Sequence, residues 1–431
     1  MTFVGITPER IAPRRWAEVL ASPIAEVAEL GAVVVTDYDL IREVLRDDQR
    51  FGPAVAALAR PALRRLARED PDVLDRYRRT RARPVGYAPA LIQAEGDAHS
   101  QHRVALGEWF SPQRLVSLRP QLDDLAGRLW AAAAQRPQPI DVRTNFSEPF
   151  SLAVLTHALG LPVDDAEQLG EWSHAIFLLR KEVVSRDEFV AGTAARQAVH
   201  DYFTQRLAVA REQSAALGRP QLLDALARRL DGAHSETVSG LTLDILQQLL
   251  VAGNESTAAT LPGIVALALG PAPTRWTDLD VDELTTVGLR LCHSSRAIAR
   301  LATRDTELGG LRVRRNQLLW LHLEIANRDP RHFPGDPLHL PGKTGDTSKA
   351  GDTSKAGDTG KRPNRPHLAF GHGSHRCVGA NLATIEIRTA LAVLARDYPS
   401  VRLVDVSWPE HYDLALRAPD KVLIDLTGAE T

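Results

Sequence analysis

The stretch Phe370-Gly-His-Gly-Ser-His-Arg-Cys377-Val-Gly379-Ala places a cysteine in a glycine-rich loop. Gly371, Gly373 and Gly379 permit a positive φ and let a flat ligand approach the backbone closely. Backbone N–H groups in such a loop can point at the sulfur, which lowers the basicity of a thiolate and tunes a metal bound to it. The apolar run over residues 382–394 predicts a helix after the loop, and its N-terminal end favours a bound anion. This environment suits a thiolate ligand to iron.

The loop resembles the haem-binding loop of the cytochrome P450 family, whose pattern is Phe-x-x-Gly-x-His-x-Cys-x-Gly, and it matches every fixed position. A pattern with this many fixed positions is far more specific than a single glycine fingerprint. The resemblance implies haem b (iron protoporphyrin IX) as the cofactor, with Cys377 as the axial ligand to the iron. It also implies that Phe370, Gly371, His375 and Gly379 line the cofactor.

Two other interpretations of the cysteine stay open at this stage. One is a buried free cysteine in a glycine-rich turn. The other is a structural zinc site made by Cys292, His293, His375 and Cys377, whose residue types suit zinc, although their spacing is not the usual two-residue knuckle.

A second group of residues is expected to bind the cofactor's edge. His99 and Arg103 are four residues apart, so on a helix they share one face. The resemblance implies that this pair points at the haem propionates, carboxylates that arginine can bind through two parallel hydrogen bonds. It also places Arg300, in a strand predicted over residues 296–305, and His375 at propionate-binding positions.

The opposite side of the cofactor is expected from Leu-Val-Ala252-Gly253-Asn-Glu255-Ser256-Thr257, inside a long predicted helix. Ala252 and Gly253 have almost no side chain, so this helix can lie close to a flat ligand. A mid-helix hydroxyl can donate to the carbonyl four residues earlier. The segment resembles the family's Ala/Gly-Gly-x-Asp/Glu-Thr signature, which implies that Glu255 and Ser256 relay protons during oxygen activation. Ser256 stands where threonine is usual and lacks the methyl that restricts χ1, and Thr257 offers an alternative hydroxyl.

The chain departs from the family at the Glu-x-x-Arg signature. Arg290 occupies the arginine position, but Val287 stands where the glutamate is expected, and the segment after Phe333-Pro334 offers no arginine. A buried arginine without a carboxylate is costly. We therefore expect Arg290 to be more exposed than in the family, or paired with Asp336 or a backbone carbonyl, with reduced stability or weaker haem retention.

Periodic apolar residues predict a fold that is mostly α with a minor β portion. The resemblance spans about residues 31–426 and implies the cytochrome P450 fold, a large helical domain plus a small β-rich subdomain, with haem between the long central helix and the cysteine loop. The predicted helices cover residues 19–30, 115–134, 151–159, 189–210 and 241–269. The predicted strands are residues 31–36, a hairpin over 297–313 that turns at 308–310, and residues 401–406 and 421–426.

A single domain is expected over residues 1–431, because no linker divides the chain. Residues 343–361 read KTGDTSKAGDTSKAGDTGK, a Gly-Asp-Thr-Ser-Lys-Ala repeat within that domain. Such a tract has no apolar face, so it predicts a solvated surface loop without a function of its own.

Composition restricts the classes of partner and compartment. The 52 basic and 54 acidic residues give a net charge of −2, which offers no general case for nucleic acid or a membrane surface. Two cysteines cannot form a disulfide framework, which fits a reducing, cytoplasmic setting. The N-terminus lacks the pattern of a signal peptide, and the most apolar stretch, residues 261–273, is too short to span a bilayer.

These observations favour a haem-thiolate monooxygenase that hydroxylates or epoxidises a small organic substrate, free or carrier-bound, in bacterial secondary metabolism. The resemblance implies ferredoxin and ferredoxin reductase as electron donors, with a basic patch at Arg376, Arg362 and Arg365. Oxidative coupling or ring formation without oxygen insertion is one alternative, and a non-catalytic haem-binding module is another. Substrate contacts are expected from residues 78–93, 166–194, 248–256, 296–299 and 410–416.

Overall fold

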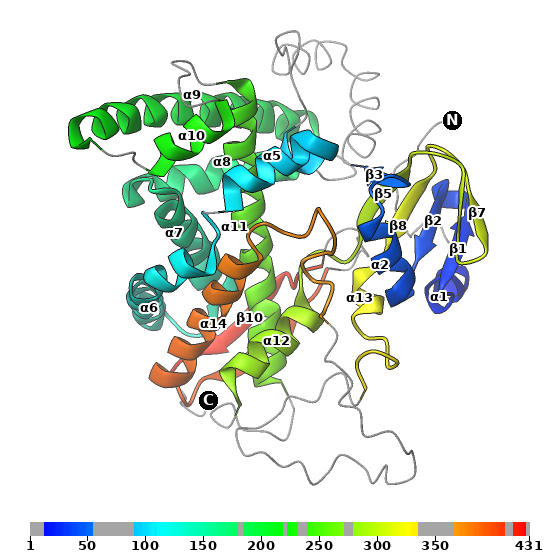
Figure 1. Cartoon of the computed structure of the whole chain (residues 1–431). Coiled ribbons are helices and arrows are strands. Elements are labelled where there is room, and N and C mark those ends of the chain that lie inside the picture. The colour runs from blue at the N-terminus through cyan, green and yellow to red at the C-terminus, as the bar shows by residue number, and fades with distance from the viewer. Residues whose placement is uncertain are drawn as a thin grey trace.

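The computed structural model describes residues 13–54, 90–107, 109–179, 184–218, 222–231, 239–270, 279–334, 366–409 and 417–427. The long helix α11 (Gly240–Leu269) runs through the middle of the helical part (Figure 1). It is buried on most sides, which matches a sequence that is apolar around nearly the whole helix. The helices that pack against it are α7 (Glu148–Leu159), α8 (Ala166–Leu178), α9 (Arg186–Leu217), α10 (Leu222–Asp231), α12 (Val281–Cys292) and α14 (Ala380–Asp397).

Other short and long helices complete the described part. They are α1 (Pro13–Ala21), α2 (Tyr38–Arg46), α5 (Gly96–Gly107), α6 (Pro112–Ala134) and α13 (Leu323–Ala326), with the single turns η2 (Ala28–Leu30), η3 (Leu91–Gln93), η4 (Arg143–Ser147) and η5 (Val163–Asp165).

The strands form three sheets. The largest has the order β1-β2-β8-β5-β3, in which β2 and β8 are parallel and the other neighbours antiparallel. A three-stranded sheet has the order β4-β10-β9, and β6 pairs with β7 alone. The strands are β1 (Ile24–Val27), β2 (Ala32–Val35), β3 (Phe51–Pro53), β4 (Ile140–Asp141), β5 (Ile298–Ala302), β6 (Thr306–Leu308), β7 (Leu311–Val313), β8 (Leu318–Leu321), β9 (Arg402–Ser407) and β10 (Lys421–Asp425).

The predicted balance of a mostly α fold with a minor β portion is confirmed. Two local predictions are wrong. The helix expected over residues 19–30 ends at Ala21, because the residue before Pro23 is disfavoured in the helical conformation, and residues 24–27 pair with β2 instead. The hairpin expected over 297–313 is confined to β6 and β7, because β5 pairs with β8 and β3. The repeat at 343–361 lies outside the described residues.

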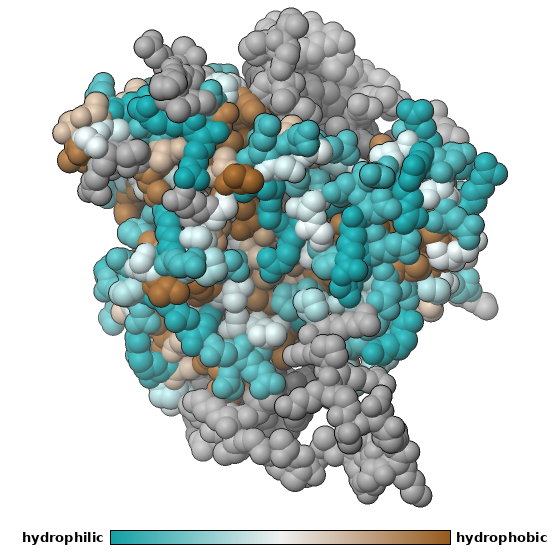
Figure 2. All heavy atoms as spheres, in the orientation of Figure 1, coloured by the Kyte–Doolittle hydropathy of each residue, from teal (hydrophilic) through white to brown (hydrophobic). Residues whose placement is uncertain are grey.

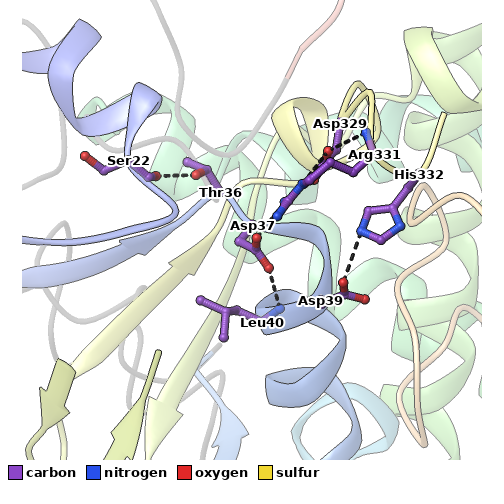
Figure 3. Close-up of polar contacts among 8 residues, drawn as sticks. All are labelled: Ser22, Thr36, Asp37, Asp39, Leu40, Asp329, Arg331 and His332. Carbon is purple, nitrogen blue, oxygen red and sulfur yellow. Dashed lines mark hydrogen bonds and ion pairs between the residues drawn. The ribbon is translucent and has the colours of Figure 1, made fainter. Parts of the chain in front are cut away.

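Helix α2 is tied to the segments that precede the cysteine loop. Asp37 caps α2 and accepts a 2.6 Å contact from the Arg331 guanidinium (Figure 3). The Tyr38 ring lies against His332, with centroids 4.4 Å apart, and its hydroxyl donates to the Pro366 carbonyl at 2.7 Å. These contacts hold the start of the loop segment against the five-stranded sheet and α2.

Polar side chains cover most of the β-rich part on the face shown in Figure 2, while apolar side chains show through among the helices. Within the described ranges, no helix has the length and apolar character that crossing a bilayer requires.

Candidate active site

The cysteine loop is a tight backbone turn. Cys377 N–H donates to the Phe370 carbonyl at 2.8 Å, and Gly371 and Gly373 have φ of 68° and 72°. A side chain on Gly373 would collide with the carbonyl of Leu45 in α2, so this glycine is required by conformation and by close packing. The predicted positive φ of these two glycines is confirmed.

Gly379 differs from the prediction. Its φ is −83°, because it already occupies the N-cap of α14 and enters the helix with a near-helical backbone. Its N–H instead donates to the Cys377 sulfur, which is the backbone donor expected for a tuned thiolate.

Cys377 is accessible, although protein surrounds its sulfur. Its side chain is exposed, yet the surrounding protein desolvates it and thereby raises the pKa of the thiol. The Gly379 N–H and the charges of Arg103 and Arg376 act in the opposite direction and favour the thiolate. A sulfur that is accessible but partly desolvated by protein is available to a ligand that packs against the loop. The alternative of a buried free cysteine is therefore wrong.

The middle of α11, which is otherwise largely buried, has one open face. Ala252 and Ser256, one turn apart, are exposed, whereas Glu255 and Thr257 are buried. Gly253 was expected to lie on the open face together with Ala252, but it faces α7 instead. A Cβ there would meet Leu155 of α7 at 3.1 Å, so its small size serves helix packing.

Four basic side chains converge beside the cysteine loop, as predicted. The rings of His99 (α5) and His375 stack with centroids 3.9 Å apart and planes at 21°. Arg103, one turn after His99, donates to the Arg376 carbonyl at 2.8 Å. Arg300 on β5 is buried, and its charge acts on both imidazoles.

These groups disfavour one another's charge. Desolvation, followed by the neighbouring positive groups, lowers the pKa of His375 to about 4 and also lowers the pKa of His99. Burial lowers the pKa of both arginines, and the charge of Asp48 only partly offsets this effect at Arg300. Desolvated guanidinium groups favour an anionic ligand. The carboxylates of a haem would supply such a ligand, and Cys377 could hold its iron.

Three consecutive polar residues of α11, Glu255, Ser256 and Thr257, have different surroundings. The Ser256 hydroxyl donates to the Ala252 carbonyl at 2.7 Å, which confirms the predicted bond to the preceding turn. The buried Glu255 carboxylate lies 3.7 Å from Nδ1 of His174 on α8. Thr257 points away from the open face and is buried.

Three residues near this region were not expected from the sequence. His174 contacts Glu255, Glu386 is a buried carboxyl group on α14, and Glu324 on α13 gathers three arginines. None belongs to a local motif, and each is recognised only by partners from distant segments.

Arg290, which lacks the glutamate of the Glu-x-x-Arg signature, has other partners in the structure. Arg290 is half-buried, donates to the Asn327 carbonyl at 2.9 Å and lies 4.9 Å from the Phe333 ring centroid. The expected pairing with a backbone carbonyl is thus confirmed, while Asp336 lies outside the described residues. Val287, one turn earlier, packs against the core.

A zinc site is not formed by the residues proposed for it. Among the described residues, no three histidine, cysteine or acidic side chains are grouped so that they could hold a metal ion. Cys292 donates instead to the Gly263 carbonyl at 3.4 Å, and burial raises the pKa of its thiol to about 11.

Comparison with known proteins supports the same assignment. A family model described as Cytochrome P450 matches residues 288–405. The chain is 30% identical to mycinamicin IV hydroxylase/epoxidase of Micromonospora griseorubida, over 90% of this chain and 88% of that protein. It is 29% identical to nocardicin C N-oxygenase of Nocardia uniformis subsp. tsuyamanensis, over 86% and 83%.

A solved structure gives the same result. A mutant of the mixed-function P450 MycG in complex with mycinamicin IV has a TM-score of 0.71 to this chain at 26% identity, with 96% of each chain covered. Similarity at this level along the length of both proteins, around a cysteine loop of this geometry, shows that the chain belongs to the cytochrome P450 family and is a haem-thiolate monooxygenase.

Proposed function

We propose that this P450 inserts oxygen into a small apolar organic substrate in bacterial secondary metabolism, and that Glu255 and Ser256 deliver the protons. The observation that carries the proposal is the open face of α11, where an alcohol is exposed directly beside a buried acid. The names of the two relatives, a hydroxylase/epoxidase and an N-oxygenase acting on natural products, favour insertion over coupling.

The cofactor-binding residues have separate roles in this proposal. Cys377 ligates the haem iron, and His99, Arg103, Arg300 and His375 hold the propionates. When bound, a haem with a thiolate ligand supplies oxygen activation, because the thiolate increases electron density at the iron and favours O–O cleavage. The protein must keep this thiolate deprotonated, which the Gly379 N–H and Arg103 favour.

The proton relay is argued from the Ser256 hydroxyl. The Ser256 hydroxyl donates to the Ala252 carbonyl and lies on the exposed face, so rotation about χ1 lets it donate to a group outside the helix. Serine rotates more freely than threonine, because it has no methyl on Cβ. Glu255 precedes Ser256 in the sequence, and its carboxyl group supplies the proton that replaces the one donated by the Ser256 hydroxyl. Thr257 is buried on another face and is not part of this path.

Electrons must come from another protein, and we propose a ferredoxin with its reductase. Arg376 is exposed beside Cys377 and offers positive charge for an acidic partner, whereas Arg362 and Arg365 lie outside the described residues. The substrate, free or carrier-bound, would contact the open α11 face. Of the expected contact segments, residues 248–256 and 296–299 are described in full, and residues 410–416 are not described.

The test combines product analysis with two variants. Under isotope-labelled O2, oxygen insertion predicts a product that carries the label, whereas coupling or ring formation yields an unlabelled product. Glu255→Gln and Ser256→Ala should keep substrate binding within about twofold and lower coupled turnover by about a hundredfold or more, as expected for loss of a proton donor.

Ser117→Ala is the matched control, because its hydroxyl also bonds to a carbonyl of the preceding turn, on the exposed surface of α6. Equal coupling in the wild type and both site variants would contradict the relay. A protein that binds haem but turns over no candidate substrate with any electron donor would favour the non-catalytic alternative.

A further inference from the structure

We infer that His174 is the side chain through which the buried Glu255 exchanges protons with solvent, and that it makes proton delivery sensitive to pH. The inference rests on the proposed Glu255–Ser256 relay and adds its connection to the outside of the molecule.

The geometry joins a buried acid to an exposed base. Helix α8 packs against α11, and His174 Nδ1 lies 3.7 Å from Glu255 Oε1. The His174 side chain is 55% exposed, whereas that of Glu255 is 7% exposed. An imidazole has two nitrogens, so one can face the carboxylate while the other exchanges protons with water. Glu255 itself has almost no contact with solvent.

The charges around His174 favour its protonated form. The charged groups that face it are Glu255 on α11, Glu148 at the start of α7 and Arg143 in η4. The contact with the Glu255 carboxylate contributes most to a raised pKa of His174, while desolvation and Arg143 act in the opposite direction. Arg143 is itself paired with Glu148 at 2.8 Å, which reduces its repulsion.

Two roles of His174 can be separated by substitution. Glutamine keeps a polar side chain but carries neither charge nor an exchangeable imidazole proton. Arginine keeps the positive charge beside Glu255 but does not titrate at neutral pH. If His174 only restrains Glu255 by charge, His174→Arg behaves as the wild type. If His174 exchanges protons, both variants lose the function.

The first measurement follows the imidazole itself. NMR titration of the haem-loaded, ferrous CO-bound protein should give His174 a pKa above 6.5, the ordinary value for histidine. In Glu255→Gln this pKa should fall toward the ordinary value. The exposed His157 on α7 is the internal reference. A His174 pKa that is unchanged by Glu255→Gln would overturn the inference.

The second measurement is the pH profile of coupled turnover. In the wild type, coupling should decline as pH rises through the pKa measured for His174. His174→Gln and His174→Arg should lose this limb and run about a hundredfold below the wild type on its acid side, the lower end of the range for a lost proton-transfer group. Substrate binding should stay within about twofold, and His157→Gln should match the wild type.

Failure of this inference is distinguishable from failure of the relay. If Glu255→Gln uncouples turnover but His174→Gln keeps the wild-type pH limb, solvent reaches Glu255 by another path and the inference is wrong. If His174→Arg matches the wild type at every pH, the role is restraint by charge and the inference is also wrong. Unaltered coupling in Glu255→Gln would instead contradict the relay.

Discussion

Glu386 lies two turns into the helix that follows the cysteine loop, and its carboxyl group is buried. Its Oε1 has no hydrogen-bond partner among the described residues, while the Ser151 hydroxyl contacts the carboxyl group. Burial raises the pKa of Glu386 to about 8, so at neutral pH the folded protein holds this acid largely protonated.

Glu386→Gln should therefore stabilise the protein, and by more as pH rises. The folded pKa is above the ordinary 4.5, so the wild type loses stability as pH increases from about 4.5 to about 8. Glutamine has no proton to lose and removes that dependence. Thermal melts at pH 5 and pH 8 check this, with a larger gain in Tm expected at pH 8. A variant that is less stable at pH 8 would show that the carboxylate form is required.

At the scale of elements, Glu324 connects α13 to three other segments. Its carboxylate lies 2.9 Å from Arg296, 3.4 Å from Arg328 and 3.4 Å from Arg417. Arg328 and Arg417 also donate to the Leu291 carbonyl at the end of α12. Burial acts to raise the pKa of Glu324, but the three guanidinium groups outweigh it and the pKa is lowered.

Glu324→Gln should lower the free energy of unfolding by about 3 kcal/mol at neutral pH, because it leaves three enclosed cations without their carboxylate. A lowered folded pKa means that this stabilisation is present above the unfolded pKa and is lost as pH falls through the folded value. Denaturant melts at neutral and acid pH measure both. Asp282→Asn, which breaks the exposed pair with Arg388, is the control and should cost under about 1 kcal/mol. An equal, small effect of both changes would refute the role of Glu324.

Val287→Glu tests whether the missing signature carboxylate can be restored. Arg290 already has the Asn327 carbonyl and the Phe333 ring as partners, and Val287 packs against apolar neighbours. We therefore expect a loss of about 1–3 kcal/mol, the cost of an unsatisfied buried polar group. Val287→Gln separates polarity from charge. A higher Tm with tighter haem binding would show that Arg290 accepts the restored partner.

Some parts of the site could be predicted from the sequence and others could not. The cysteine loop and the open α11 face could be predicted, because each lies within one short segment whose residue types express their chemistry. Glu324 and His174 could not be, because their partners come from elements far apart in the chain. The strand at 24–27 was missed because its stability depends on pairing with β2, which overrides the helical periodicity.

At the scale of the whole molecule, the site assembles from segments spread along the chain. The loop of Cys377 near the C-terminus, the open face of α11 in the middle and α5 near the N-terminus each supply one part (Figure 1). The similarity to mycinamicin IV hydroxylase/epoxidase extends over 90% of this chain, which agrees with a fold that is shared as a whole.

The central claim is that Cys377 is the thiolate that binds the haem iron. The optical spectrum of the reduced, CO-bound protein tests it most directly, because a thiolate ligand gives this complex a characteristic red-shifted band. Cys292→Ala is the matched control, since the half-buried Cys292 donates to the Gly263 carbonyl and its thiol pKa is raised to about 11. The wild type and Cys292→Ala should show the thiolate band, and Cys377→Ala should lack it. A normal thiolate band in Cys377→Ala would contradict the assignment of the site.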